Sequence, residues 1–186
     1  MKSKLNKVAL IIGALALTFA SCEKALNIND NPNSPTSTTP ALVLPTTIVA
    51  TGNAVPSLSS YGSQLMGYYA NGGGVSGWGA IITYNYTTSN FTGLWSTPYN
   101  ILNDLEYVIN SSTDQEQHLK YAALVLKAYQ FEQLVNTYND VPYTDALQGD
   151  GKLTPTYDKA EDIYKKIGAL LDESIAFFKS SSKATY

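Results

Sequence analysis

The chain has few of the residues on which most catalytic and nucleic-acid sites depend. Among its 186 residues are one cysteine, one histidine and no arginine. A single cysteine cannot form an intramolecular disulfide, so no such crosslink holds the fold together. Without arginine, and with a net charge of −3, the chain lacks the basic patches with which proteins bind nucleic acids or clamp phosphate groups. Both of these classes of function are therefore disfavoured.

The first 21 residues have the pattern of a secretory signal. Lys2, Lys4 and Lys7 precede an uninterrupted apolar run from Val8 to Leu17, and the small residues Ala20 and Ser21 directly precede Cys22. The apolar run is short for spanning a bilayer, so we favour a cleaved signal over an uncleaved membrane anchor. Removing residues 1–21 takes away three of the 12 basic residues and none of the 15 acidic ones, which leaves a net charge of −6.

The position of Cys22, after small residues at the end of the apolar run, resembles the bacterial lipoprotein signal. In that signal the cysteine is diacylated and becomes the new N-terminus, which holds the protein on a membrane without a spanning helix. The alternative, a free thiol beside an ordinary cleavage site, leaves an exposed unpaired cysteine on an exported protein. Asn, Asp, Ser, Thr and Pro dominate the stretch that follows, so we predict a lipidated, extended tether over residues 22–40 and a folded body over residues 41–186.

The strongest structural signal is the stretch from Leu119 to Leu147. Its apolar residues recur at spacings of three and four, which predicts a long, largely buried helix. Asn139 and Asp140 favour leaving the helix, and Pro142 disfavours a helical conformation in the residue before it, so the helix is expected to stop there. A turn fixed by the sequence then follows.

Similar spacing predicts further helices over residues 41–53, 57–70, 91 or 95 to 109, and 158–179. We expect Asp114 to cap the long helix. In the last helix we expect Ile163, Ile167, Leu170, Leu171, Ile175 and Phe178 to point inward. No convincing strand pattern occurs, so the predicted fold is all-α. The last two helices resemble a tetratricopeptide-type hairpin.

The candidates for catalysis or metal binding are weak. His118 is the only histidine, and a lone histidine lacks the partners that nucleophilic or metal chemistry needs. Asp140, Asp145 and Asp150 could serve a glycosidase, but their spacing does not require two carboxylates to face each other across a sugar. We interpret these acids as turn-forming residues that accept hydrogen bonds from backbone amides. The sequence predicts no catalytic residue, metal site or cofactor.

Aromatic residues are plentiful, with 14 tyrosines, two tryptophans and five phenylalanines. Many of them crowd into a glycine- and asparagine-rich region between residues 61 and 99. Aromatic faces that stack on sugar rings, surrounded by amide and hydroxyl groups, are what a glycan site needs. Core packing accounts for most of them. Because loops often carry function, the candidate ligand-binding residues are Trp78, Tyr84, Tyr86 and Trp95.

Several separated segments together resemble the N-terminal part of a SusD/RagB-type nutrient-binding lipoprotein of the Bacteroidetes outer membrane. They are the lipoprotein signal at Cys22, NDNPNSPT at Asn29–Thr36, TYNDVPYTDAL at Thr137–Leu147 and PTYDKAEDIY at Pro155–Tyr164. Members of that family are much longer than this chain, so residues 41–186 resemble an N-terminal fragment of a larger SusD-like domain.

The resemblance implies a non-catalytic, tetratricopeptide-like scaffold anchored to the cell surface by lipid. It implies capture of glycans or other oligomeric nutrients and their delivery to a TonB-dependent SusC-like porin. Because ligand residues vary in this family, only Cys22 is carried over by the resemblance. Two alternatives remain: a helical-repeat lipoprotein that acts only in protein docking, and a surface glycosidase that uses Asp140 or Asp145.

Overall fold

The computed structural model describes residues 38–72, 79 and 83–180. In this part of the chain the elements are α3 (Pro40–Leu65), α5 (Thr92–Ser111), the 3₁₀ turn η1 (Asp114–Glu116), α6 (Gln117–Tyr138), the 3₁₀ turn η2 (Gly149–Gly151) and α7 (Ala160–Ser180). The predicted signal peptide, Cys22, most of the predicted tether and Trp78 lie outside the described residues.

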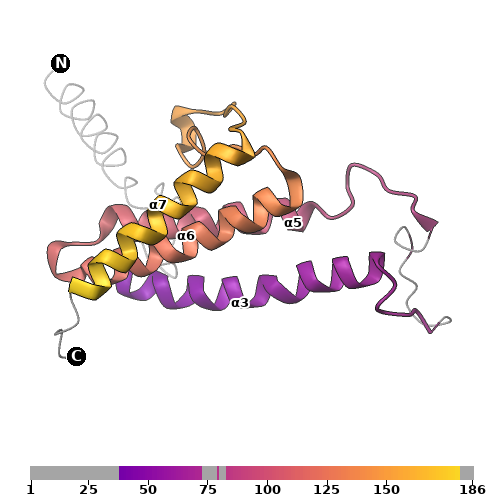
Figure 1. Cartoon of the computed structure of the whole chain (residues 1–186), viewed down its shortest axis with the longest axis horizontal. Helices are drawn as coiled ribbons and strands as arrows, with labels where there is room; N and C mark the ends of the chain where they lie inside the picture. The colour runs from indigo at the N-terminus through magenta and orange to yellow at the C-terminus, as the bar shows by residue number, and fades with distance from the viewer. Residues whose placement is uncertain (1–37, 73–78, 80–82, 181–186) are drawn as a thin grey trace, which may run out of the picture. The chain divides into compact units, whose positions relative to one another are not determined.

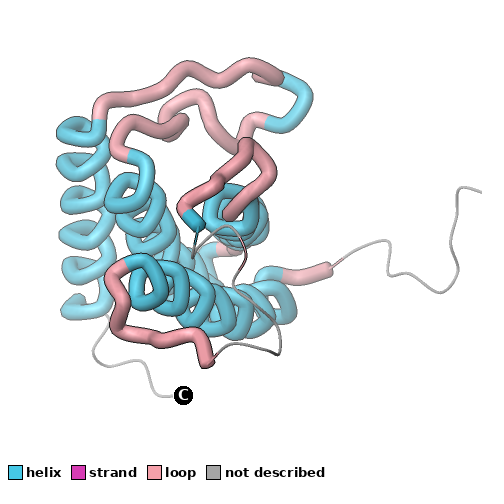
Figure 2. The backbone as a smooth tube through the Cα atoms, turned by 90° about the vertical axis from the view of Figure 1, so that its right-hand side faces the viewer, coloured by secondary structure: helices cyan, strands magenta, loops and turns pink. Residues whose placement is uncertain are grey.

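Helix α6 is the central element of the described fold (Figure 1). It packs against α5, α7 and α3, and α3 also packs against α5. The predicted all-α fold is confirmed, since the described backbone consists of helices and loops (Figure 2). The only strand-like pairing among the described residues is an isolated antiparallel bridge between Val141 and Asp158. This bridge joins the segment after α6 to the segment before α7.

The core lies between α5, α6 and the inner face of α7. Apolar side chains at helical spacing are buried on α5, and one face of α6 is buried while Val125 and Tyr138 of α6 are exposed. The main buried residues are Ile101, Leu102, Leu105, Val108, Ala123, Ala128, Phe131, Leu134, Val135, Val141, Ile163 and Ile167. Burying each such aliphatic or aromatic side chain stabilises the fold by roughly 1.5–3 kcal/mol before entropy is counted. Helix packing therefore dominates the stability of this unit.

Helix α3 differs from the prediction. The sequence predicted two short helices, over residues 41–53 and 57–70, but the structure has one helix of 26 residues that includes both Pro45 and Pro56. A proline inside a helix removes one backbone hydrogen bond, and contacts of Leu44, Thr47 and Thr51 with the core offset that loss. By length and composition alone, α3 could also cross a membrane.

Helix α6 begins and ends close to where the sequence predicted. Asp114 does not cap α6: it begins η1, the turn that leads into α6, and Thr113 caps that turn, with its backbone N–H donating to the Glu116 carboxylate at 3.1 Å. At its end, Asn139 adopts a positive φ of 66° and its N–H still donates to the carbonyl of Val135 at 2.8 Å. Asparagine tolerates this left-handed region better than most residues, so the stop is encoded locally.

Helix α7 corrects a second prediction. Ile163, Ile167 and Ser174 are buried, and Phe177 stacks on Tyr121 of α6 at 4.0 Å between ring centroids. Three of the residues expected to point inward are instead exposed, namely Leu171, Ile175 and Phe178. The helix carries two apolar stripes, and only one of them can face α6. With Tyr164, the three exposed residues form an outer apolar stripe.

Candidate functional site

A groove opens between α3, α5 and α6. Its volume is about 590 Å³, which lies within the range of small-molecule sites. Tyr61 comes from α3, Phe91 from the residue preceding α5, and Gln133 and Thr137 from α6. Asn53, Ser57 and Thr97 add further amide and hydroxyl groups. The groove therefore combines aromatic surface with short polar side chains.

Gln130 fixes the floor of this groove. It lies in α6 with only 2% of its surface exposed, and its Nε2 donates to Thr51 Oγ1 of α3 at 3.0 Å. A buried amide without a partner would cost roughly 1–3 kcal/mol, so this contact specifies how α3 sits on α6. The register of α3 in turn places Asn53, Ser57 and Tyr61 along the groove.

An aromatic chain leads from the groove to the loop before α5. The rings of Tyr61 and Phe91 have centroids 4.5 Å apart, Phe91 and Tyr86 are 5.3 Å apart, and Tyr86 and Tyr84 are 6.2 Å apart. Phe91 has a φ of 62°, a conformation that is strained for a bulky residue. Two of the predicted ligand residues, Tyr84 and Tyr86, therefore lie at an exposed extension of the groove's aromatic wall.

Trp95 lies elsewhere. It is in the first turns of α5, as the predicted helix from residue 91 or 95 to 109 allows, and its ring meets Tyr138 of α6 edge-on at 5.0 Å and lies 6.2 Å from Tyr157. Trp95 also contacts Tyr99 and packs against the core. The structure thus brings Tyr84 and Tyr86 together and separates Trp95 from them. Trp95 and the exposed Tyr138 and Tyr157 form a second aromatic patch.

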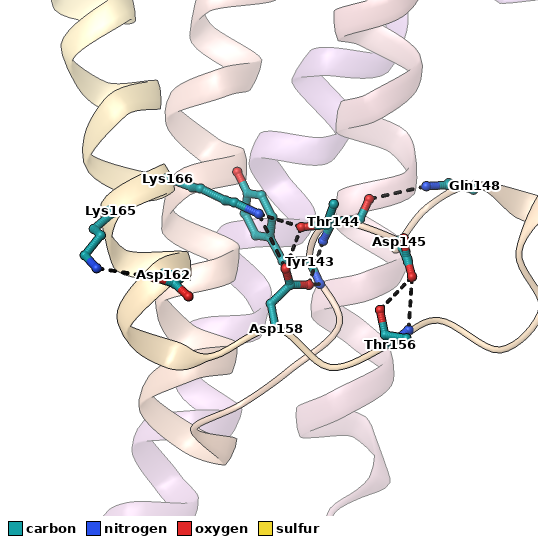
Figure 3. A network of polar contacts seen from close by, with 9 residues as sticks. All are labelled: Tyr143, Thr144, Asp145, Gln148, Thr156, Asp158, Asp162, Lys165 and Lys166. Carbon is teal, nitrogen blue, oxygen red and sulfur yellow. Dashed lines mark hydrogen bonds and ion pairs between the residues drawn. The ribbon is translucent and has the colours of Figure 1, made fainter.

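The turn after α6 is tied to the start of α7 by carboxylates (Figure 3). Asp158 accepts hydrogen bonds from the backbone N–H groups of Tyr143 at 3.0 Å and Thr144 at 2.8 Å, and also from the Thr144 hydroxyl. Asp145 accepts from the Thr156 hydroxyl at 2.6 Å. Asp140 accepts from the N–H of Ala160, the first residue of α7, at 3.0 Å.

Asp140 and Asp145 were expected to accept hydrogen bonds from local backbone amides of the turn. The backbone amides that they bind instead belong to Ala160 and Thr156, 20 and 11 residues further along the chain. These contacts also account for the titration of the acids. Hydrogen bonding by Lys159 and by Thr156 lowers the pKa values of Asp140 and Asp145, respectively. Burial alone would raise the pKa of Asp158, but the hydrogen bonds from Thr144 and Tyr143 outweigh it and lower the pKa to about 2. Asp140, Asp145 and Asp158 therefore stay ionised and hydrogen-bonded near neutral pH, and their role is to hold the turn in place.

The tyrosines beneath this turn are held as neutral phenols. Burial raises the pKa of Tyr99, with a further contribution from Tyr157, and the Tyr99 hydroxyl donates to the carbonyl of Pro142 at 2.8 Å. Burial likewise raises the pKa of Tyr143, whose ring lies 4.8 Å from the ammonium of Lys166. Tyr99 thus attaches α5 to the turn, and neither phenol ionises near neutral pH.

Among the described residues, no Asp, Glu, Lys, Arg or His lines the groove. The sequence from Asn31 to Asn103 contains none of these residues at all, so α3 and the first half of α5 are uncharged. The charged pair nearest to the middle of α5, Glu106 with Lys127 at 2.7 Å, is not part of the lining. The groove can therefore offer stacking surface and neutral hydrogen-bonding groups to a ligand.

Metal chemistry has no visible site in residues 38–72, 79 and 83–180. No three His, Cys, Asp or Glu side chains gather there where they could hold a metal ion. His118 is exposed on the first turn of α6. The carboxylates of Asp140, Asp145 and Asp158 are engaged by backbone amides, hydroxyls and lysines.

Comparison with known proteins identifies the family of this chain. A model of SusD-like proteins, described as starch-binding and associating with the outer membrane, matches residues 32–186. The chain belongs to the SusD-like family. The match includes both segments that carried the resemblance most strongly, Thr137–Leu147 and Pro155–Tyr164.

A solved structure supports the SusD-like fold. A SusD/RagB family protein from Bacteroides thetaiotaomicron superposes with a TM-score of 0.62 at 22% sequence identity, and the match covers 75% of this chain. It covers 30% of that protein, so the chain spans about 30% of the length of the solved relative. No curated protein matches the sequence. At this identity the structural likeness establishes the fold.

Neither the groove nor the contact between Gln130 and Thr51 at its floor was predicted from the sequence. The groove joins residues that are far apart in the chain, and Gln130 and Thr51 are separated by 79 positions. One signal was present: Gln130 lies four residues from both Leu126 and Leu134, in the middle of an apolar stripe. A polar side chain in such a stripe needs a buried hydrogen-bonding partner. The position of Gln130 therefore indicates where a neighbouring helix supplies a polar group.

Proposed function

We propose that this SusD-like chain is part of a non-catalytic, cell-surface lipoprotein that captures glycans or other oligomeric nutrients. The observation that carries the proposal is the groove between α3, α5 and α6. Its aromatic wall at Tyr61 and Phe91 can stack on sugar rings, and its amides and hydroxyls can exchange hydrogen bonds with sugar hydroxyls. Family membership supports a nutrient-binding role associated with the outer membrane in general.

The proposal extends to attachment and delivery. Lipidation of Cys22 would hold the protein on the outer membrane, and captured nutrient would pass to a TonB-dependent SusC-like transporter. Replacing Cys22 with Ala should release the protein from membranes into the soluble fraction, as measured by fractionation and immunoblotting. Stable membrane retention of the variant would contradict the lipid anchor. Recovery of a porin with the tagged wild-type protein from outer membranes, and its absence with an unrelated lipoprotein, tests the partner.

Ligand capture can be tested by filling the groove. Gly93 lines the groove at the start of α5, and a Cβ there would meet only Thr97 Oγ1 at 4.0 Å. Gly93→Leu should therefore keep the fold while its side chain occupies ligand space. Gly168→Leu is the matched control, because Gly168 lies in α7, outside the groove, with nothing near its Cβ position.

We expect wild type and Gly168→Leu to bind the same members of a glycan array, and Gly93→Leu to bind at least tenfold more weakly, a loss of about 1.4 kcal/mol. Equal binding by all three proteins would place ligand capture elsewhere. Binding of peptides but no glycans would overturn the assignment to sugars. Far-UV circular dichroism checks that both variants remain helical.

A further inference from the structure

We propose that the groove selects uncharged oligosaccharides over acidic ones. This inference rests on the proposed function and adds the charge class of the ligand. Its basis is the composition of the groove: three helices contribute aromatic, amide and hydroxyl groups to one open site, and none contributes a side chain that is charged at neutral pH.

The polar groups of the groove fit neutral hydroxyls. The side-chain amides of Asn53 and Gln133 and the hydroxyls of Ser57 and Thr97 line it, and each of these groups can both donate and accept hydrogen bonds. A sugar hydroxyl likewise donates and accepts. The aromatic rings of Tyr61 and Phe91 can cover the apolar face of a sugar without discriminating between hydroxyl patterns.

An acidic sugar would enter the same groove without a counter-charge. A carboxylate or sulfate loses hydration on binding, and an uncompensated charge is costly unless a cation pairs with it. The chain has no arginine, and no lysine lines the groove. The excess of acidic over basic residues in the whole chain adds weak long-range repulsion. Both effects favour neutral ligands.

The first turn of α5 is the one feature of the groove that would favour an acidic ligand. Gly93 and Leu94 line the groove, and a helix N-terminus attracts anions through its free backbone N–H groups. However, the N–H of Leu94 already donates to the carbonyl of Phe91 at 2.9 Å, which reduces what that turn offers. The uncharged side chains on all sides of the groove therefore decide its preference.

The experiment compares two oligosaccharides of equal length, a neutral glucan and an oligogalacturonate, by isothermal titration calorimetry with the purified chain. We expect the neutral ligand to bind at least tenfold more tightly. Gln133→Lys introduces a cation at the groove and should reverse or abolish this preference. Gln115→Lys is the control, because Gln115 is exposed in η1, outside the groove lining, and it should keep the preference.

The outcomes separate the two proposals. Equal or tighter binding of the oligogalacturonate by wild type would overturn the charge preference while leaving ligand capture intact. A preference for the neutral ligand that Gln133→Lys does not change would show that selection occurs outside this groove and would also overturn the inference. If neither saccharide, nor any other glycan on an array, binds, the proposed function fails and the inference fails with it.

Discussion

Replacing Asp158 with Asn tests whether the turn after α6 is fixed by a single carboxylate. One oxygen of Asp158 accepts two backbone N–H groups, and the other accepts the Thr144 hydroxyl and lies 3.4 Å from the Lys166 ammonium. An asparagine keeps the size of the side chain and one acceptor oxygen. Its amide nitrogen could still donate to the Thr144 hydroxyl oxygen, but it would face the Lys166 ammonium without a negative charge. The substitution therefore removes the charge and half of the accepting capacity.

The expected cost is about 2 kcal/mol, since hydrogen bonds to a charged group contribute roughly 1.5–3 kcal/mol. For a unit of this size, that corresponds to a fall in Tm of about 4–8 °C. Urea unfolding followed by far-UV circular dichroism measures the change in the free energy of unfolding. Asp172→Asn is the matched control: Asp172 is exposed on α7, so its replacement should change stability by less than about 0.5 kcal/mol.

The same carboxylate makes stability depend on acid. Its pKa in the folded chain is about 2, below its ordinary value of 3.8, so folding favours the ionised form. The resulting stabilisation is complete above about pH 4 and is lost as the pH falls towards 2. Allowing for solvent screening, it is on the order of 1 kcal/mol. Asp158→Asn should therefore lose less stability than wild type between pH 4 and pH 2. Equal urea midpoints for wild type and Asp158→Asn at pH 7 would refute the reasoning.

Four further substitutions, in three experiments, test the packing of α3, α5 and α6. Thr51→Val and Gln130→Leu, singly and together in urea unfolding, should show a coupling of about 1 kcal/mol if their hydrogen bond forms; additive effects would mean that it does not. Trp95→Ala should lower the free energy of unfolding by about 2–3 kcal/mol and remove much of the tryptophan emission, and unchanged stability would show that Trp95 is not packed on Tyr138. Pro56→Ala should raise thermal stability by about 1–2 kcal/mol if α3 is continuous through that position, because proline is costly inside a helix; a lower Tm would indicate a break there.

The helices could be predicted because their signals are local. The stop of α6 is signalled by Asn139, Asp140 and Pro142 within four residues, and the buried residues of α5, among them Ile101, Leu105 and Val108, recur at helical spacing. The continuity of α3 could not be predicted in the same way. A proline inside a helix does destabilise it, but the contacts that α3 makes with residues far along the chain outweigh that cost. Thr51, one of those contacts, has no special signal in its own neighbourhood.

Helix α7 shows a different limit. Its sequence contains two apolar stripes, and periodicity alone does not say which stripe meets α6. The answer lies in the turn: the hydrogen bonds of Asp140 and Asp158 fix the direction and rotation with which α7 begins. Those bonds join residues up to 20 positions apart. The groove has the same origin, since it exists only once three helices are packed.

The uncharged segment from Asn31 to Asn103 also has a consequence for the kinetics of capture. A charged site draws a charged ligand from a distance, and its association rate falls as salt screens that attraction. A site bordered by α3 and the first half of α5 exerts no such pull, so its ligand arrives by plain diffusion at any ionic strength. The time that a nutrient stays bound is then set by dissociation, through the fit of rings and hydroxyls in the groove. Such a site would retain its ligand equally well in dilute and in salty surroundings.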